Sequence, residues 1–150
     1  MGSTRMSKKR IVITGLGMVS PLGNTVADNW NTLVAGVRGI GPLTRFDASN
    51  LACQIAGEVK DFDITQYIPA KEARRMDVFI HYGIAAAFQA IEDAGLDNIE
   101  GLDKTRVGVN IGAGIGGLPS IEATGADVIA GGIRKINPFF IPGSLINLIE

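Results

Sequence analysis

The sequence predicts a protein of the α/β class. Three short apolar runs rich in β-branched residues are typical of strands, namely RIVIT (10–14), QIAGEV (54–59) and RVGVNI (106–111). Segments with helical periodicity lie between them, and this alternation favours layered packing with crossover connections. The 150 residues, 46% of them apolar, are enough to form a sizeable core.

The first helix is predicted over residues 25–37. It follows the strand at 10–14 and a turn at 15–23 that is punctuated by glycine and proline. Asn24 or Thr25 would be its N-cap, and Asp28 stands three residues after Thr25, in a capping-box-like position. The apolar side chains of this helix share one face: Val26, Trp30, Leu33, Val34 and Val37.

Two further helices are predicted between the second and third strands. Residues 63–76 favour a short helix that is broken near Pro69. The alanine-rich segment 77–95 then favours a longer helix. Its stripe consists of Phe79, Gly83, Ala86, Ala87, Ala90, Ile91 and Ala94.

The third strand leads through a glycine-rich loop into a helix predicted over residues 120–130. Residues 138–150, PFFIPGSLINLIE, then favour an apolar helix after Pro142 that no stop signal closes. We therefore expect the natural chain to continue past Glu150. MGSTR (1–5) reads as an added leader, so residues 6–150 are expected to be the N-terminal part of a larger domain, apparently truncated.

Composition excludes several function classes. The net charge of −1 argues against a nucleic-acid-binding protein, which needs basic residues to neutralise phosphates. No apolar run approaches the ~20 residues that cross a bilayer, and no signal-peptide pattern is present. A cytoplasmic protein without a membrane segment fits best.

The lone cysteine and the lone histidine both favour structural roles. Cys53 rules out a disulfide framework and a cysteine-based metal site within this sequence. It lies in an apolar run and is predicted to be a small buried hydrophobe, with no histidine or helix N-terminus beside it to form a thiolate. His81 lies off the stripe of its helix and is also expected to be structural. No cofactor or metal is predicted.

GAGIGG (112–117) has the letters of a dinucleotide fingerprint between a strand and a helix. The fingerprint also requires a later strand ending in Asp or Glu to hold the ribose, and none follows at the required spacing. GLGMVS (15–20) has the same defect, and no G-K-[ST] is present for a phosphate-binding loop of the Walker type. Nucleotide binding is therefore a minor alternative.

Another function suits the same glycines. They would permit tight turns, or let backbone approach a ligand closely. Ile115, flanked by glycines, could then act as a stopper in a narrow apolar tunnel.

Three cations lie four residues or fewer apart. Lys71, Arg74 and Arg75 occupy positions i, i+3 and i+4, which share one face of a helix. A solvated surface is one interpretation, and a docking patch for an acidic protein or a phosphorylated ligand is the other. Glu72 and Asp77 dilute the charge.

The motifs together resemble a known family. In order they are VITGLGMVSPLG (12–23), WNTLVAGVRGI (30–40), RFD (45–47), AGEVKDF (56–62), MDVF (76–79), AIEDAGL (90–96), RVGV (106–109), GAGIGG (112–117) and PFFIP (138–142). The set is similar to the N-terminal third of a β-ketoacyl-[acyl-carrier-protein] synthase, most of all the type II condensing enzyme of bacterial fatty-acid synthesis. It covers nearly the whole chain after the leader.

The resemblance implies a thiolase-like fold of two βαβαβαββ halves, of which this chain would hold most of the first. It also implies a decarboxylating Claisen condensation, in which an acyl-cysteine is attacked by the carbanion from malonyl-acyl carrier protein. The nucleophilic cysteine and two histidines would lie after residue 150, and Cys53 and His81 do not match them. This chain alone is therefore expected to be inactive, and to be unstable or to associate.

The binding residues implied by the resemblance are within the chain. Ile115 matches the gate of the acyl pocket, and Phe140 matches a pocket residue near the interface of a homodimer. Lys71, Arg74 and Arg75 match the patch that receives acyl carrier protein. Glu150 departs from the small residue usual at its position. A catalytically silent relative, such as the chain-length-factor partner of polyketide ketosynthases, is the alternative function.

Overall fold

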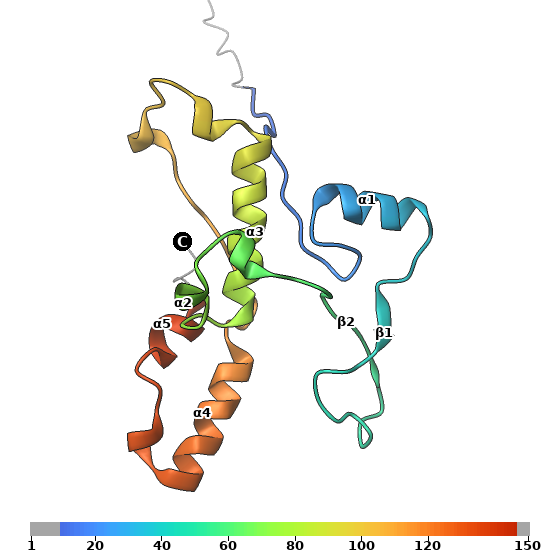
Figure 1. The fold of residues 1–150 in the computed structure, drawn as a ribbon, viewed down its shortest axis with the longest axis vertical. Helices are drawn as coiled ribbons and strands as arrows, with labels where there is room; N and C mark the ends of the chain where they lie inside the picture. The colour runs from blue at the N-terminus through green and yellow to red at the C-terminus, as the bar shows by residue number, and fades with distance from the viewer. Residues whose placement is uncertain (1–9, 147–150) are drawn as a thin grey trace, which may run out of the picture.

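The computed structural model describes residues 10–146 and is organised along two helices. Helix α3 (Val78–Asp93) and helix α4 (Leu118–Gly131) follow each other along the long axis of the molecule (Figure 1). The remaining elements are α1 (Val26–Val34), β1 (Ile40–Pro42), β2 (Ile55–Gly57), α2 (Ala70–Ala73) and α5 (Phe140–Ser144), with 3-10 turns at Ile64–Gln66, Leu96–Asn98, Lys104–Arg106 and Ile133–Lys135. Figure 1 shows α1 and the β1–β2 hairpin to one side of α3.

The two strands form an antiparallel hairpin. Ile40 pairs with Gly57, Gly41 with Ala56, and Pro42 with Ile55. The strand predicted at 54–59 is thus confirmed over its central residues, whereas β1 was not expected from the sequence. The next bond outward, from Leu43 N to Gln54 O at 2.9 Å, continues the ladder beyond Pro42.

Capping residues set the start of α1 as predicted. Thr25 adopts an extended conformation, and its hydroxyl accepts a hydrogen bond from Asp28 N at 3.1 Å. The helix ends at Val34, three residues earlier than expected. Asn29 is its buried residue, whereas Trp30 on the apolar face is 63% exposed. The apolar face of α1 therefore lacks a packing partner among the residues that the structure describes.

The stripe of small residues on α3 does have a partner. The N-terminal segment runs along it, and a Cβ atom on Gly15 would lie 2.6 Å from Ala94 N. A Cβ atom on Gly17 would overlap the carbonyl group of Ala86. Glycine at both positions lets backbone lie directly on the helix, and the Leu16 N–H donates to Asp93 Oδ2 at 2.9 Å.

The strand predictions at 10–14 and 106–111 are wrong for this structure. Both segments are unpaired, and they run along opposite sides of α3 in the view of Figure 1. A strand needs a hydrogen-bonded neighbour, and within residues 10–146 neither segment has one. Ile11 is 96% exposed as a result.

The buried core is small. In the described part of the chain, the buried apolar residues are Ala48, Ala73, Ile80 and Ala85. The accessible surface is 11928 Å², against roughly 7,300 Å² for a compact protein of this mass. Most of the apolar side chains predicted to build a core remain accessible.

The C-terminal prediction needs a correction. Helix α5 begins at Phe140, before Pro142, and its last residue is Ser144. Proline is tolerated there because the N–H groups of a first helical turn have no intrahelical partner. The expected continuation at 147–150 and the leader at 1–5 lie outside the described residues. Helix α4, in contrast, confirms the helix predicted at 120–130.

Candidate functional site

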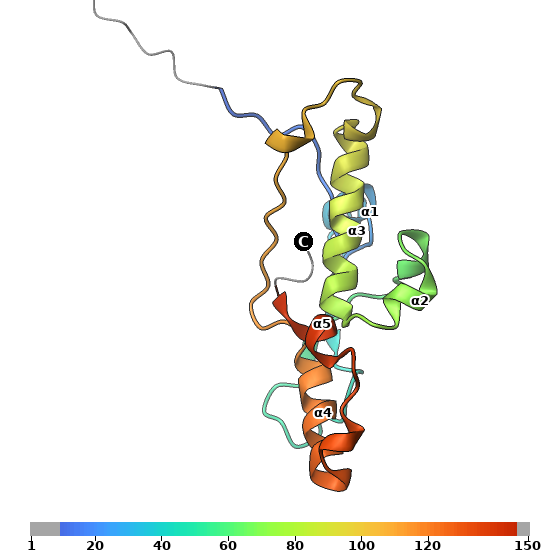
Figure 2. The ribbon, with the colours of Figure 1, turned by 90° about the vertical axis from the view of Figure 1, so that its left-hand side faces the viewer.

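Figure 2 shows that α3, α4 and α5 meet at one end of α3. Asp77 directly precedes α3 and bonds to both other helices, and we call this point the Asp77 junction. Its backbone N–H donates to Gly143 O in α5 at 2.9 Å. Its carboxylate oxygen Oδ2 accepts hydrogen bonds from the backbone N–H of Ser120, at 3.2 Å, and from the Ser120 hydroxyl. The Gly117 N–H donates to Ser144 O at 3.0 Å. Three separate parts of the chain are thereby fixed to each other.

A cavity of about 200 Å³ opens beside this junction. Its lining includes Arg74 and Arg75, Ser120 and Thr124 of α4, and Phe140 of α5. The sequence assigned the arginines and Phe140 to different functions, namely carrier docking and acyl binding. The structure brings them to the same cavity.

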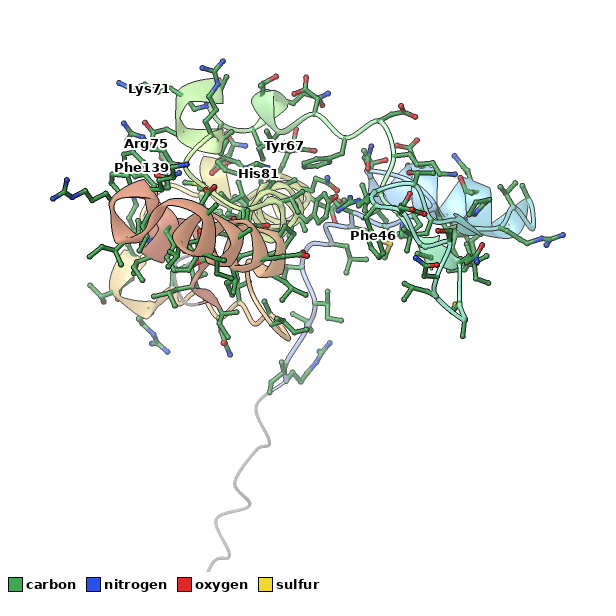
Figure 3. The ribbon with its side chains drawn as sticks, turned by 90° about the horizontal axis from the view of Figure 1, so that it is seen from below. Phe46, Tyr67, Lys71, Arg75, His81 and Phe139 are labelled. Carbon is green, nitrogen blue, oxygen red and sulfur yellow. The ribbon has the colours of Figure 1, made fainter. Side chains whose placement is uncertain are left out.

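The three cations of the predicted basic patch divide into two kinds. Lys71 and Arg74 are exposed, and neither forms an ion pair with any residue in the described range 10–146. Arg75 instead pairs with Glu72 at 3.5 Å, and its guanidinium lies 4.7 Å from the centre of the Phe139 ring. Figure 3 shows Lys71 projecting at the outer edge while Arg75 lies beside Phe139. Lys71 and Arg74 are thus the cations available to a partner.

Ile115 lies in the loop that leads into α4, and its side chain is 67% exposed. Cβ atoms on Gly112 and Gly114 would meet nothing within 4 Å, so the loop before Ile115 is uncovered at both glycines. Gly116 has φ +84°, and a Cβ atom on it would lie 2.7 Å from Ser144 O. The loop therefore contacts the end of α5, although Ile115 does not line the cavity that Phe140 lines.

The same contacts argue against a nucleotide at this loop. A dinucleotide fingerprint places the pyrophosphate at the N-terminus of the following helix, where free N–H groups attract anions. Here the Asp77 carboxylate already accepts the Ser120 N–H in the first turn of α4. A phosphate would have to displace or repel a buried carboxylate, so the nucleotide alternative is not supported by this geometry.

Comparison with protein families identifies the chain. The family described as "Beta-ketoacyl synthase, N-terminal domain" matches residues 8–149. The chain belongs to this family. It is also 51% identical, over 144 residues, to the 3-oxoacyl-[acyl-carrier-protein] synthase 2 of Vibrio harveyi. That match covers 96% of this chain and 34% of the relative, so the chain spans about a third of the length of such relatives.

Solved structures of ketosynthases share the fold. A β-ketoacyl synthase from Burkholderia phymatum matches with a TM-score of 0.75 and 25% identity, over 94% of this chain and 35% of that one. A type II polyketide acyl-carrier protein in complex with its ketosynthase matches with a TM-score of 0.71 and 25% identity, over 92% of this chain and 37% of that chain. The predicted thiolase-like α/β class is confirmed, in a form with few paired strands.

The two lone reactive residues of this ketosynthase chain lie apart from the junction. Cys53 is exposed, so the prediction that it is buried is wrong. It precedes β2 in the β1–β2 hairpin, and Figure 1 shows this hairpin to one side of α3. His81 Nε2 lies 2.9 Å from Ala73 O and ties α3 to α2, which is the kind of structural contact expected.

Hydrogen bonds lower the pKa of carboxyl groups at the periphery. Thr44 donates its hydroxyl to Glu58 at 2.7 Å and its backbone N–H at 3.0 Å, which lowers the pKa of Glu58. Thr65 lowers the pKa of Asp63 in the same way. Within the described segment, no His, Cys, Asp and Glu side chains gather as metal ligands, and no helix is long and apolar enough to span a membrane.

Sequence reasoning missed the role of Asp77 and Ser120. Asp77 precedes α3 and has the residue type of an N-cap, yet its side chain makes no capping bond to α3. It reaches α4 instead, 43 residues along the chain. One signal was available in the sequence: an acidic residue two positions after a pair of arginines, at the start of an apolar helix.

Proposed function

We propose that this chain is the N-terminal part of a β-ketoacyl-[acyl-carrier-protein] synthase, which extends an acyl chain by two carbons. The identity of 51% to a 3-oxoacyl-[acyl-carrier-protein] synthase 2, over nearly the whole chain, carries the proposal. The complete enzyme would be a cytoplasmic homodimer. Its nucleophilic cysteine and two histidines would lie after residue 150.

The reaction has two bond-forming steps. The cysteine thiolate first displaces the carrier thiol from an acyl thioester. Malonyl-acyl carrier protein then loses CO₂, and the resulting carbanion attacks the acyl-cysteine carbonyl, which expels the cysteine thiolate and leaves a β-ketoacyl carrier protein. The present residues would supply binding for these steps rather than chemistry.

Three features support binding roles. Ile115 presents an apolar side chain that is 67% exposed and so accessible to an acyl chain. Phe140 lines a cavity together with Arg74 and Arg75, consistent with a pocket close to a docking surface. Lys71 and Arg74 are available to an acidic partner, and the proposed partner is acyl carrier protein.

The test is condensation by the complete protein. Purified enzyme, acyl-acyl carrier protein and malonyl-acyl carrier protein should give a β-ketoacyl product and CO₂, detected by mass spectrometry of the carrier. A complete chain with another residue, such as Gln, in place of the cysteine, and without condensing activity, would instead identify the silent chain-length-factor-like partner. Activity confined to this 150-residue chain would contradict the proposed division of roles.

Ile115→Phe in the complete enzyme should hinder long acyl chains more than short ones. A larger side chain narrows the gate, and we expect kcat/KM for a long-chain substrate to fall about tenfold further than for a short one. Ile115→Val is the matched control, because it keeps a β-branched apolar residue of smaller volume. Equal losses for all chain lengths with Ile115→Phe would remove Ile115 from the gate.

A further inference from the structure

Asp77 is hydrogen-bonded to both α4 and α5, beside the cavity that Arg74, Arg75 and Phe140 line. Arg74 and Arg75 precede Asp77 in the sequence, with Met76 between, and line the same cavity. Its N–H bonds to Gly143 O in α5, the helix that begins with Phe140. Its carboxylate holds the first turn of α4, which follows the loop that contains Ile115.

The position of the carboxylate is closely defined. Asp77 is only 8% exposed, and its Oδ2 accepts both hydrogen bonds from Ser120. A Cβ atom on Gly117 would lie 2.9 Å from Oδ2, so the glycine that ends the loop leaves the space that the carboxylate needs. A negative charge at a helix N-terminus is also favoured by the helix dipole. The contact therefore fixes both the direction of α4 and the end of the loop.

We propose that Asp77 is a positioning residue, which holds the Ile115 loop against α5 and so sets the acyl gate relative to Phe140. This inference rests on the proposed function, because it concerns the gate of the same enzyme. Asp77 itself touches no reacting atom. Its effect is transmitted through Ser120 and through the contact of Gly116 and Gly117 with Ser144.

Two variants test the proposal in the complete enzyme. Asp77→Asn keeps the size of the side chain but removes its charge, and Ser120→Ala removes the hydroxyl donor while the backbone bond to α4 remains possible. Each should change the ratio of kcat/KM between a long-chain and a short-chain acyl substrate by about tenfold, because misplacement of a gate by a fraction of an ångström is costly. Ser120→Thr keeps the hydroxyl and should restore the wild-type ratio.

Asp93→Asn is the matched control. Asp93 is the last residue of α3. Like that of Asp77, its Oδ2 accepts a backbone N–H, which comes from Leu16. This variant loses a comparable hydrogen bond far along the helix from the Ile115 loop. It should leave the chain-length ratio unchanged, even if its stability falls as much as that of Asp77→Asn.

Hydrogen exchange gives a readout that does not depend on activity. Amides of residues 112–117 should exchange faster in Asp77→Asn and Ser120→Ala than in the wild type, and not in Asp93→Asn. Unchanged exchange and an unchanged chain-length ratio would overturn the inference, as would equal changes in Asp93→Asn. A wild-type enzyme that does not condense would defeat the proposed function, while the exchange comparison would still decide the position of the loop.

Discussion

The double charge reversal Lys71→Glu and Arg74→Glu is expected to weaken acyl-carrier-protein binding strongly at low salt. Both side chains are exposed and free of ion pairs within residues 10–146, so an acidic partner would meet two negative charges in place of two positive ones. Each reversal should cost about 1 kcal/mol, and together they should weaken binding roughly thirtyfold. Isothermal titration calorimetry on the complete enzyme measures the change.

Salt dependence and position are the controls for this result. The difference should shrink towards zero near 1 M salt, where the Debye length falls to ~3 Å. The double variant Arg38→Glu and Lys104→Glu changes the net charge equally at two exposed sites outside the patch, and should bind almost as well as the wild type. If both pairs of substitutions weaken binding equally, the patch is not the docking site.

Arg75→Glu should behave differently from the reversals at Lys71 and Arg74. It would lose the ion pair with Glu72 and the contact with the Phe139 ring, and would place two carboxylates side by side. We therefore expect a loss of stability along with any loss of binding. The structure separates one structural arginine from two cations available for docking, which the spacing of the three residues does not reveal.

Gly17→Ala is expected to destabilise the complete enzyme by about 2–3 kcal/mol. A Cβ atom there would overlap the Ala86 carbonyl oxygen and lie 3.0 Å from Ala90 N, and neither backbone atom can rotate away as a side chain can. Urea denaturation followed by circular dichroism measures the free energy of unfolding.

Gly41→Ala is the control for this substitution. A Cβ atom on Gly41 would meet nothing within 4 Å, and the φ angle of this residue is not positive, so alanine should be nearly neutral there. A Gly17→Ala enzyme as stable as the wild type would mean that the N-terminal segment does not lie directly on α3.

The features that the sequence predicted correctly depend on neighbouring residues. Thr25 and Asp28 define the start of α1 within one turn, and the alanine-rich stretch encodes α3 by its own periodicity. The basic cluster is also a local feature, since Lys71 and Arg74 are one helical turn apart, and its docking role stays a prediction. Family motifs added Ile115 and Phe140, which no local rule would have singled out, and their binding roles also stay predictions.

The features that it missed depend on distant partners. The segments 10–14 and 106–111 have strand-like composition, but composition supplies no neighbour to pair with. The exposure of Cys53 depends on the position of the hairpin relative to α3, which the apolar residues flanking Cys53 do not indicate. Asp77 was read as a charge that dilutes the basic patch, because its bond to Ser120 joins residues 43 positions apart.

The small core has a consequence for how the proposed enzyme is made. On a ribosome these residues would emerge well before the cysteine-bearing segment, with Ile11 and Trp30 still uncovered. Partly folded chains expose apolar surface and unpaired strand edges, and both favour aggregation. The first half would then complete its packing only after later residues are synthesised. Chaperone binding would be most needed during that interval of synthesis.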